Sequence, residues 1–110
     1  MRLFVASMLA LLSALGAAPA GAADLLSESQ ARAKAVQILL GEPYGKTPAD
    51  VARNLKESSL ITAGSAEPCG RVNKPVWRIH VLVQNPTIDS YLVLDARTGR
   101  IVCAGLPFLS

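Results

Sequence analysis

Apolar and polar side chains alternate over residues 75–84, where the sequence reads PVWRIHVLVQ. One face of this segment carries only large apolar side chains: Trp77, Ile79, Val81 and Val83. The other face is mixed and carries Val76, Arg78, His80 and Leu82. A period of two is typical of a β-strand that buries one face and leaves the other partly in water. The pattern therefore predicts a strand over residues 75–84, the strongest in the chain.

Three further segments of the second half are predicted as strands: residues 59–62, 89–95 and 100–104. The last two are joined by the sequence DARTG, in which Gly99 is free to adopt positive φ, so a hairpin turn is expected there. Residues 64–74 are polar and rich in turn-forming residues, and they predict a loop that holds Cys69. The second half is therefore expected to form an antiparallel sheet.

The first half has the period of helices. Ser27 and Gln30 form a capping-box pattern, apolar or small residues follow at helical spacing, and Gly41 is a natural stop. A first helix is therefore predicted over residues 28–40. Thr47 as a cap and Pro48 at the first helical position predict a second helix that runs to about residue 57.

Helices that precede the strands, rather than alternating with them, indicate an α+β fold. We expect two short N-terminal helices packed on one face of a three- to four-stranded antiparallel sheet. The apolar face that carries Trp77 is expected to meet the helices. Trp77 is predicted as a core anchor, with an exposed binding position as the alternative. Tyr44 and Tyr91 are each open to either interpretation.

Residues 1–23 have the order of a secretory signal peptide. A basic start at Arg2 is followed by an apolar run and then by the small residues of GAAPAGAA. Cleavage is expected after Ala22 or Ala23, and residues 24–110 then form a single domain with no membrane span. The alternative is an uncleaved anchor, which Pro19 disfavours because it would break the helix that has to span the bilayer. The predicted location is periplasmic or secreted, in a bacterium.

Export decides how the two cysteines are interpreted. Cys69 and Cys103 are the only cysteines, and an even pair in an oxidising compartment favours a disulfide. Two separated thiols and His80 are too few for a structural metal site, and the Cys-x-x-Cys spacing of redox sites is absent. A bridge across a loop of this length is worth roughly 3.5–4 kcal/mol in the chain-entropy model. We therefore expect a disulfide and no metal.

Loss of the leader removes Arg2, so ten basic residues face eight acidic ones and the net charge is +2. This charge is too small to indicate nucleic acid as a partner. Five basic residues fall in the predicted sheet half: Arg71, Lys74, Arg78, Arg97 and Arg100. Four acidic residues fall in the predicted helical half: Glu28, Glu42, Asp50 and Glu57. This asymmetry has two interpretations: the charged residues form an ordinary solvated surface, or the basic half attracts an acidic partner.

Candidate catalytic groups are few. His80 is the only histidine, and along its own strand its same-face neighbours are Arg78 and Leu82, neither of which can act as an orienting acid. Asp89 and Asp95 stand at opposite ends of one predicted strand, about 20 Å apart, too far for paired acid–base chemistry. We expect His80 to be a half-exposed residue with no catalytic role. We also expect the protein to have no enzyme activity and no cofactor. A hydrolase that depends on His80 is the least favoured alternative.

The strand PVWRIHV and the segment YLVLDARTGRIV resemble the PepSY domain family. The hallmark of this family is a strand that closes in an Asp-x-x-Thr-Gly turn, matched here by Asp95, Thr98 and Gly99. The resemblance covers roughly residues 28–104 and implies an extracytoplasmic binding or regulatory module, often suggested to restrain peptidases. The second helix and the pair Cys69 and Cys103 depart from the simplest family pattern. A weaker similarity, in topology alone, is to the repeat of secreted β-lactamase-inhibitor protein.

These observations predict an exported, non-catalytic PepSY-like interaction module that binds a protein partner, a peptidase or another envelope protein. The residues expected to contact the partner are Arg78, His80, Tyr91 and Arg97. The alternative is a stand-alone structural or stress-related envelope protein without a specific partner. The sequence leaves the oligomeric state and the identity of the partner open.

Overall fold

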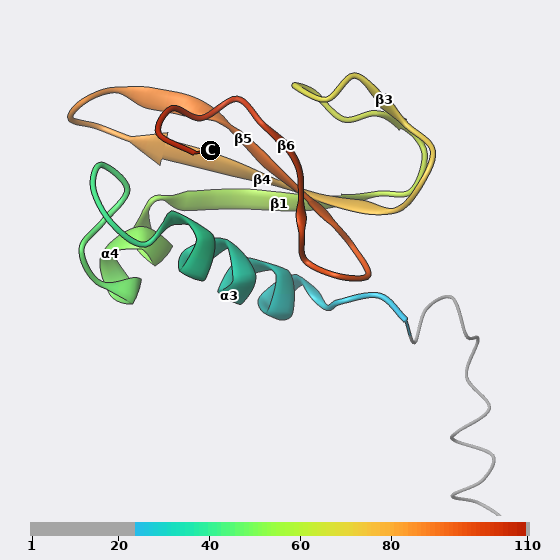
Figure 1. Cartoon of the computed structure of the whole chain (residues 1–110), viewed down its shortest axis with the longest axis horizontal. Helices are drawn as coiled ribbons and strands as arrows, with labels where there is room; N and C mark the ends of the chain where they lie inside the picture. Colours follow the sequence, from blue (N-terminus) through green and yellow to red (C-terminus); the bar gives the residue numbers. More distant parts are fainter. Residues whose placement is uncertain (1–23, 110) are drawn as a thin grey trace, which may run out of the picture.

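The computed structural model describes residues 24–109, and the predicted signal peptide lies outside these residues. Two helices lie on one side of a four-stranded antiparallel sheet, and a separate two-stranded hairpin stands at one end (Figure 1). The fold is therefore α+β, as the sequence predicts. No helix within residues 24–109 is long and apolar enough to cross a membrane.

The helices are α3 (Glu28–Leu39) and α4 (Pro48–Arg53). The main sheet has the order β1-β4-β5-β6, and each pair of neighbours is antiparallel. Its strands are β1 (Leu55–Ile61), β4 (Val76–Val83), β5 (Ile88–Asp95) and β6 (Ile101–Ala104). The hairpin is formed by β2 (Gly64–Ser65) and β3 (Arg71–Val72), within a segment for which the sequence predicts only a loop.

Helix α3 begins as its capping box predicts. The backbone N–H of Gln30 donates to the hydroxyl of Ser27 at 3.1 Å, and the backbone N–H of Ser27 donates to the side chain of Gln30 at 2.8 Å. These two bonds satisfy amides that have no partner within the helix. The helix buries Ala31, Ala35 and Leu39 against the sheet and ends one residue before the predicted position.

The predicted second helix is too long. Helix α4 ends at Arg53, and residues expected in its last turn belong instead to β1, which begins four residues before the predicted first strand. The side-chain amide of Asn54 donates to the carbonyl of Tyr44 at 2.8 Å, and the carbonyl of Asn54 accepts from the backbone N–H of Leu82 at 2.9 Å. These long-range bonds draw the chain into the sheet, and Leu55 is buried there on the core face.

The main core lies between the helices and the sheet. The apolar stripe of β4, from Trp77 to Val83, is buried in it as the alternation predicts. Trp77 is 9% exposed, and its indole N–H donates to the carbonyl of Leu26 at 3.0 Å. Trp77 is therefore a core residue rather than an exposed binding residue. Tyr44 is also buried, and its hydroxyl donates to the carbonyl of Pro107 at 2.5 Å.

A second, smaller core lies on the opposite face of the sheet. Ala66 of the hairpin loop packs with Val76 and Val93, and all three are fully buried. Cys69 and Cys103 form the predicted disulfide, with their Cα atoms 5.7 Å apart. The bridge therefore fastens the hairpin to β6 and covers one half of this face. The other half remains open.

Candidate functional site

Five side chains from three strands meet on the open half of the sheet: Glu57, Arg78, His80, Asp89 and Tyr91. We call them the sheet-face cluster. Glu57 joins it because β1 contains a β-bulge. Leu55 pairs with Val81 and Ser58 pairs with Ile79, so that two residues of β1 stand opposite one residue of β4, His80. A bulge of this kind redirects a side chain, and here it brings Glu57 to the imidazole.

The bulge is braced from the helix layer. The guanidinium of Arg32, on α3, donates to the carbonyl of Lys56 at 2.6 Å, to the carbonyl of Leu55 at 3.0 Å and to the hydroxyl of Ser58 at 3.2 Å. Ser58 also donates to the carboxylate of Glu28. Backbone carbonyls at an irregular point of a strand need partners, and Arg32 supplies them.

His80 lies between two carboxylates. Its Nε2 is 2.6 Å from Oδ1 of Asp89 on β5, and its Nδ1 is 3.2 Å from Oε2 of Glu57 on β1. The histidine side chain is 18% exposed, whereas the side chains of Glu57 and Asp89 are 66% and 63% exposed. His80 is thus more buried than the half-exposed residue that the sequence predicts. It links the two strands that flank β4.

The charge of His80 is stabilised by these contacts. The hydrogen bond with Asp89 raises the pKa of His80 above its ordinary value of 6.5, partial burial opposes that rise, and Glu57 adds to it. The pKa of Glu57 is lowered, first by a hydrogen bond from its own backbone amide and then by the bond with His80. Both directions favour an imidazolium between two carboxylates.

Tyr91 forms the aromatic centre of the cluster. It pairs directly with His80 across β4 and β5, and the two rings stack with centroids 5.0 Å apart. The guanidinium carbon of Arg78 lies 3.5 Å from the centroid of the Tyr91 ring. The Nε–H of Arg78 also donates to the carbonyl of Glu67 at 2.6 Å, in the hairpin loop. These contacts hold the cationic and aromatic side chains in fixed positions.

Three of the four predicted contact residues therefore lie together: Arg78, His80 and Tyr91. Arg97 does not join them, because it belongs to the turn after β5, beyond the end where Asp95 pairs with Val76. That turn packs against the start of α3, where the backbone N–H of Leu26 donates to the carbonyl of Ala96 at 2.7 Å. Arg97 is exposed there, apart from the sheet-face cluster.

Glu57 and Asp89 were not predicted as part of a site. Glu57 was assigned to the helical half, which is wrong, because the early start of β1 and its bulge place this residue in the sheet. Asp89 carried a signal in the sequence. Four residues lie between Val83 and Ile88, which form the first pair of the hairpin. Counting back from this pair sets His80 opposite Tyr91, and Asp89 then lies diagonally across from His80 on the same face.

The two ring nitrogens of His80 are both engaged within the cluster. Each ring nitrogen of His80 is within hydrogen-bond distance of a carboxylate, and within residues 24–109 neither is hydrogen-bonded to a hydroxyl or thiol. The two carboxylates lie at opposite sides of the ring and do not converge on one point. Within residues 24–109 no group of three or more histidine, cysteine, aspartate or glutamate side chains is arranged to hold a metal ion.

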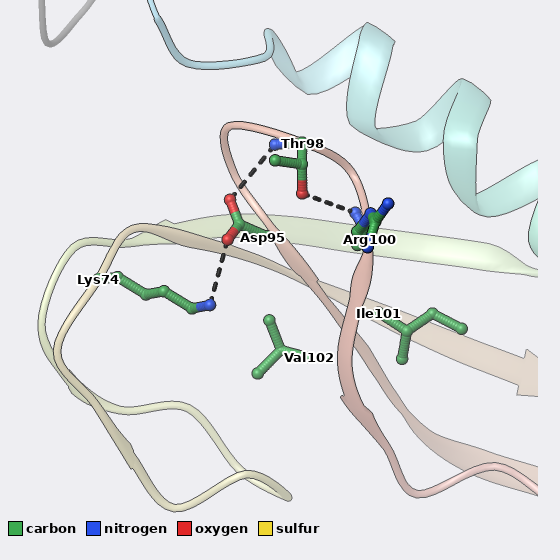
Figure 2. A pocket seen from close by; sticks show the side chains of 6 residues that line it. All are labelled: Lys74, Asp95, Thr98, Arg100, Ile101 and Val102. Carbon is green, nitrogen blue, oxygen red and sulfur yellow. Dashed lines mark hydrogen bonds and ion pairs between the residues drawn. The ribbon is translucent and has the colours of Figure 1, made fainter.

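The Asp-x-x-Thr-Gly turn has the mechanical role that its residues predict. The carboxylate of Asp95 accepts from the backbone N–H groups of Arg97 at 2.8 Å and of Thr98 at 3.3 Å, and Gly99 has φ of 78°. The other carboxylate oxygen of Asp95 is 3.2 Å from the ammonium of Lys74 (Figure 2). The pKa of Asp95 is therefore lowered, chiefly by the amide of Arg97.

An open pocket of about 580 Å³ lies beside this turn, where β6 begins. It is lined by Lys74, Asp95, Thr98, Arg100, Ile101 and Val102. Figure 2 shows Lys74 reaching from the segment before β4 toward Asp95, with Val102 below them. This edge pocket is a second candidate surface, and of the predicted residues it includes Asp95 and Thr98.

Comparison of the chain with models of protein families, with curated proteins and with solved structures finds no match in any of the three. The resemblance to the PepSY family therefore rests on the residues that carry it and stays a prediction. Inference about function has to start from the geometry of the two surfaces.

Proposed function

We propose that this chain is an exported, non-catalytic interaction module that binds a protein partner through the sheet-face cluster. The observation that carries the proposal is the fixed arrangement of Arg78, His80 and Tyr91 on the half of the sheet that the hairpin leaves open. Tyrosine and arginine are enriched among residues that dominate binding energy. Side chains that are already held in place lose less entropy when a partner binds.

The charges of the cluster favour specific recognition. Arg78 and His80, whose pKa is raised by these contacts, stand beside the carboxylates of Glu57 and Asp89, so the surface presents paired polar groups of both signs rather than a broad field of one sign. Arrangements of this kind fix the orientation of a partner. If the partner bound in another orientation, its charged groups would lie against groups of the same sign on this surface. The partner is therefore expected to carry complementary polar groups around an apolar or aromatic contact with Tyr91.

The hydrogen bonds of His80 support a role without catalysis. A general base needs a free nitrogen near the proton that it accepts, and both nitrogens of His80 already face carboxylates. The resemblance of the segment around Asp95, Thr98 and Gly99 to the PepSY family suggests an extracytoplasmic module, with a peptidase as one class of partner. The signal-peptide pattern of residues 1–23 and the disulfide agree with a periplasmic or secreted location.

Site-specific photo-crosslinking in intact cells tests the proposal. Ser59 is exposed, pairs with Arg78 and so shares its face of the sheet, which makes it a suitable position for p-benzoylphenylalanine. Ala33 is exposed on α3, in the helix layer, and provides the matched control position. We expect a discrete protein adduct from position 59, none from position 33, and loss of the adduct when Tyr91→Ala is added.

Two results would contradict the proposal. One is the absence of any adduct from position 59 in cells that contain the folded protein. The other is an adduct that forms equally from both positions or persists in the Tyr91→Ala variant. Either result would favour a stand-alone envelope protein without a specific partner at this face.

A further inference from the structure

We infer that the free edge of β6 takes up an extended, acidic segment of a partner protein as an additional strand of the sheet. This inference rests on the proposed function and deepens it, since it names a second contact and the chemistry of what occupies it. It concerns the edge pocket and not the sheet-face cluster. The two surfaces can therefore be tested separately.

The position of β6 in the sheet is the first observation. It is the last strand in the order β1-β4-β5-β6, and within residues 24–109 it has a single neighbouring strand, β5. An edge strand presents backbone N–H and C=O groups that another extended chain can pair with.

The other edge is less suited to this pairing. Strand β1 contains the bulge at Lys56 and Glu57, and bulges interrupt the regular spacing that a new strand needs. The carbonyls of Leu55 and Lys56 are already bonded to Arg32. Strand β6 has a register shift of its own, between the residues paired with Val93 and Leu94, so the bulge alone does not distinguish the two edges. The difference is that a helix side chain takes the carbonyls of β1, whereas within residues 24–109 no helix side chain bonds to a carbonyl of β6.

The pocket beside β6 supplies room and apolar contact. Its volume is about 580 Å³, and its lining includes the aliphatic side chains of Ile101 and Val102. Ile101, although it pairs with the buried Leu94, is 42% exposed, and Val102 is partly exposed beside it. A large aliphatic side chain left half in water on an edge strand offers an apolar contact to a chain that pairs there.

The charge around the pocket selects the partner. Lys74, whose side chain is 49% exposed, and the exposed Arg100 both line it, and the exposed Arg97 lies in the adjoining turn. The one acidic residue of the pocket, Asp95, is 18% exposed at its side chain and is occupied by two backbone amides and Lys74. The rim is therefore positive toward an incoming strand, and a segment bearing Glu or Asp fits it better than a basic one.

Three synthetic peptides test the inference on the ¹⁵N-labelled, disulfide-bonded protein. The first is acetyl-(Glu-Val)₄-amide, the second is its Lys-Val counterpart, and the third is the Glu-Val peptide with alternate backbone nitrogens methylated. N-methylation removes the donors that strand pairing needs and leaves the charge unchanged. We expect the first peptide alone to shift the amide signals of residues 100–104 and to slow their hydrogen exchange.

Charge reversal in the protein provides the matched pair of variants. Arg100→Glu is expected to weaken binding of the Glu-Val peptide by about tenfold or more, because it replaces an attractive charge at the pocket with a repulsive one. Lys46→Glu makes the same change of charge at an exposed position just before α4, outside the residues that line the edge pocket, and is expected to leave binding within about twofold. Thermal unfolding of both variants establishes that each is folded.

The inference is overturned if the Glu-Val and Lys-Val peptides bind equally, or if the N-methylated peptide binds as well as its parent. It is overturned too if the shifts fall mainly outside residues 100–104 and the other residues that line the edge pocket. It is also overturned if sedimentation without peptide shows that a second copy of this chain already covers β6. In each of these cases an adduct from position 59 would leave the proposed function standing. Absence of both peptide binding and the adduct would remove the two together.

Discussion

His80 has a different environment from the one that its neighbours in the sequence suggest. Arg78 and Leu82, two positions away on the same strand, offer it no acid, yet Asp89 and Glu57 reach it from the adjacent strands. The two carboxylates are unequal partners, since the shorter contact is to Asp89 and that bond is the largest cause of the raised pKa. This inequality can be measured directly because the chain has one histidine.

Titration of the His80 ring protons by NMR gives the first prediction. The pKa of His80 is expected above 6.5 in the folded protein, to fall in Asp89→Asn, and to fall less in Glu57→Gln. The two variants are matched, since each replaces a carboxylate with the isosteric amide. A pKa at or below 6.5 in the unchanged protein, or the larger fall in Glu57→Gln, would show that the described contacts do not govern the charge of His80.

The same shift has a consequence for stability. Because the folded state raises the pKa of His80, its contribution to the free energy of unfolding is fully present below about pH 6.5 and is lost as the pH rises through the folded value. In urea unfolding, the difference in stability between the protein and its His80→Gln variant should therefore shrink as the pH increases across that window. A difference that grows with pH would contradict the assignment.

At the scale of elements, the bulge in β1 connects the helix layer to the sheet-face cluster. Arg32 bonds to two carbonyls of the bulge on one side of the sheet, and Glu57 projects to His80 on the other. Neither feature is visible in the local pattern of the sequence, because both depend on a shift of register by one residue. The position of Glu57 is thus set by a helix residue that lies outside the cluster.

Replacement of Arg32 tests this connection. Arg32→Ala is expected to lower the free energy of unfolding by about 1–2 kcal/mol, because it leaves carbonyls of the bulge without their charged donor in a partly exposed setting. It should also speed amide exchange in β1 and shift the ring signals of His80. Arg53→Ala is the control, since Arg53 is exposed and its guanidinium pairs with Asp50 one turn away, so a change within about 0.5 kcal/mol is expected. Equal effects of the two replacements would argue against the brace.

Helix caps and turns, which depend on residues close together in the sequence, could be predicted. Element ends and side-chain positions that depend on how distant strands pair could not. The capping box at Ser27 and the turn at Asp95 involve residues within a few positions of one another, and both form as predicted. The end of α4 was misplaced because it is decided by a backbone bond between Asn54 and Leu82, which lie far apart in the sequence. Tertiary contacts of this kind override the helical period of a short segment.

The same distinction applies to the candidate site. Arg78 and His80 could be assigned to one face of β4 by counting alternate residues, and Tyr91 follows from the neighbouring strand. Glu57 could not be found in this way, because a bulge changes which face a residue occupies. Arg97 is predicted to contact the partner together with Arg78, His80 and Tyr91, but it lies in the turn after β5, which is bonded to the segment before α3.

At the scale of the whole molecule, the disulfide holds together the parts that carry both candidate surfaces. It joins residues separated by 34 positions and fastens the hairpin, to which Arg78 also bonds, onto β6 beside the edge pocket. Its value of roughly 3.5–4 kcal/mol in the chain-entropy model is comparable to the stability of a small domain. A bridge of this kind is typical of chains in an oxidising compartment and agrees with the predicted export.

The central claim to be tested is that the working form of this protein lies outside the cytosol, cleaved after Ala22 or Ala23 and with its two cysteines joined. The intact mass of protein isolated from the cell envelope, measured before and after reduction and alkylation, tests this claim most directly. We expect a chain that begins at Ala23 or Asp24, is lighter by two hydrogen atoms than its free-thiol form, and takes up two alkyl groups only after reduction. A chain that retains residues 1–23, or one that is alkylated without reduction, would contradict the account.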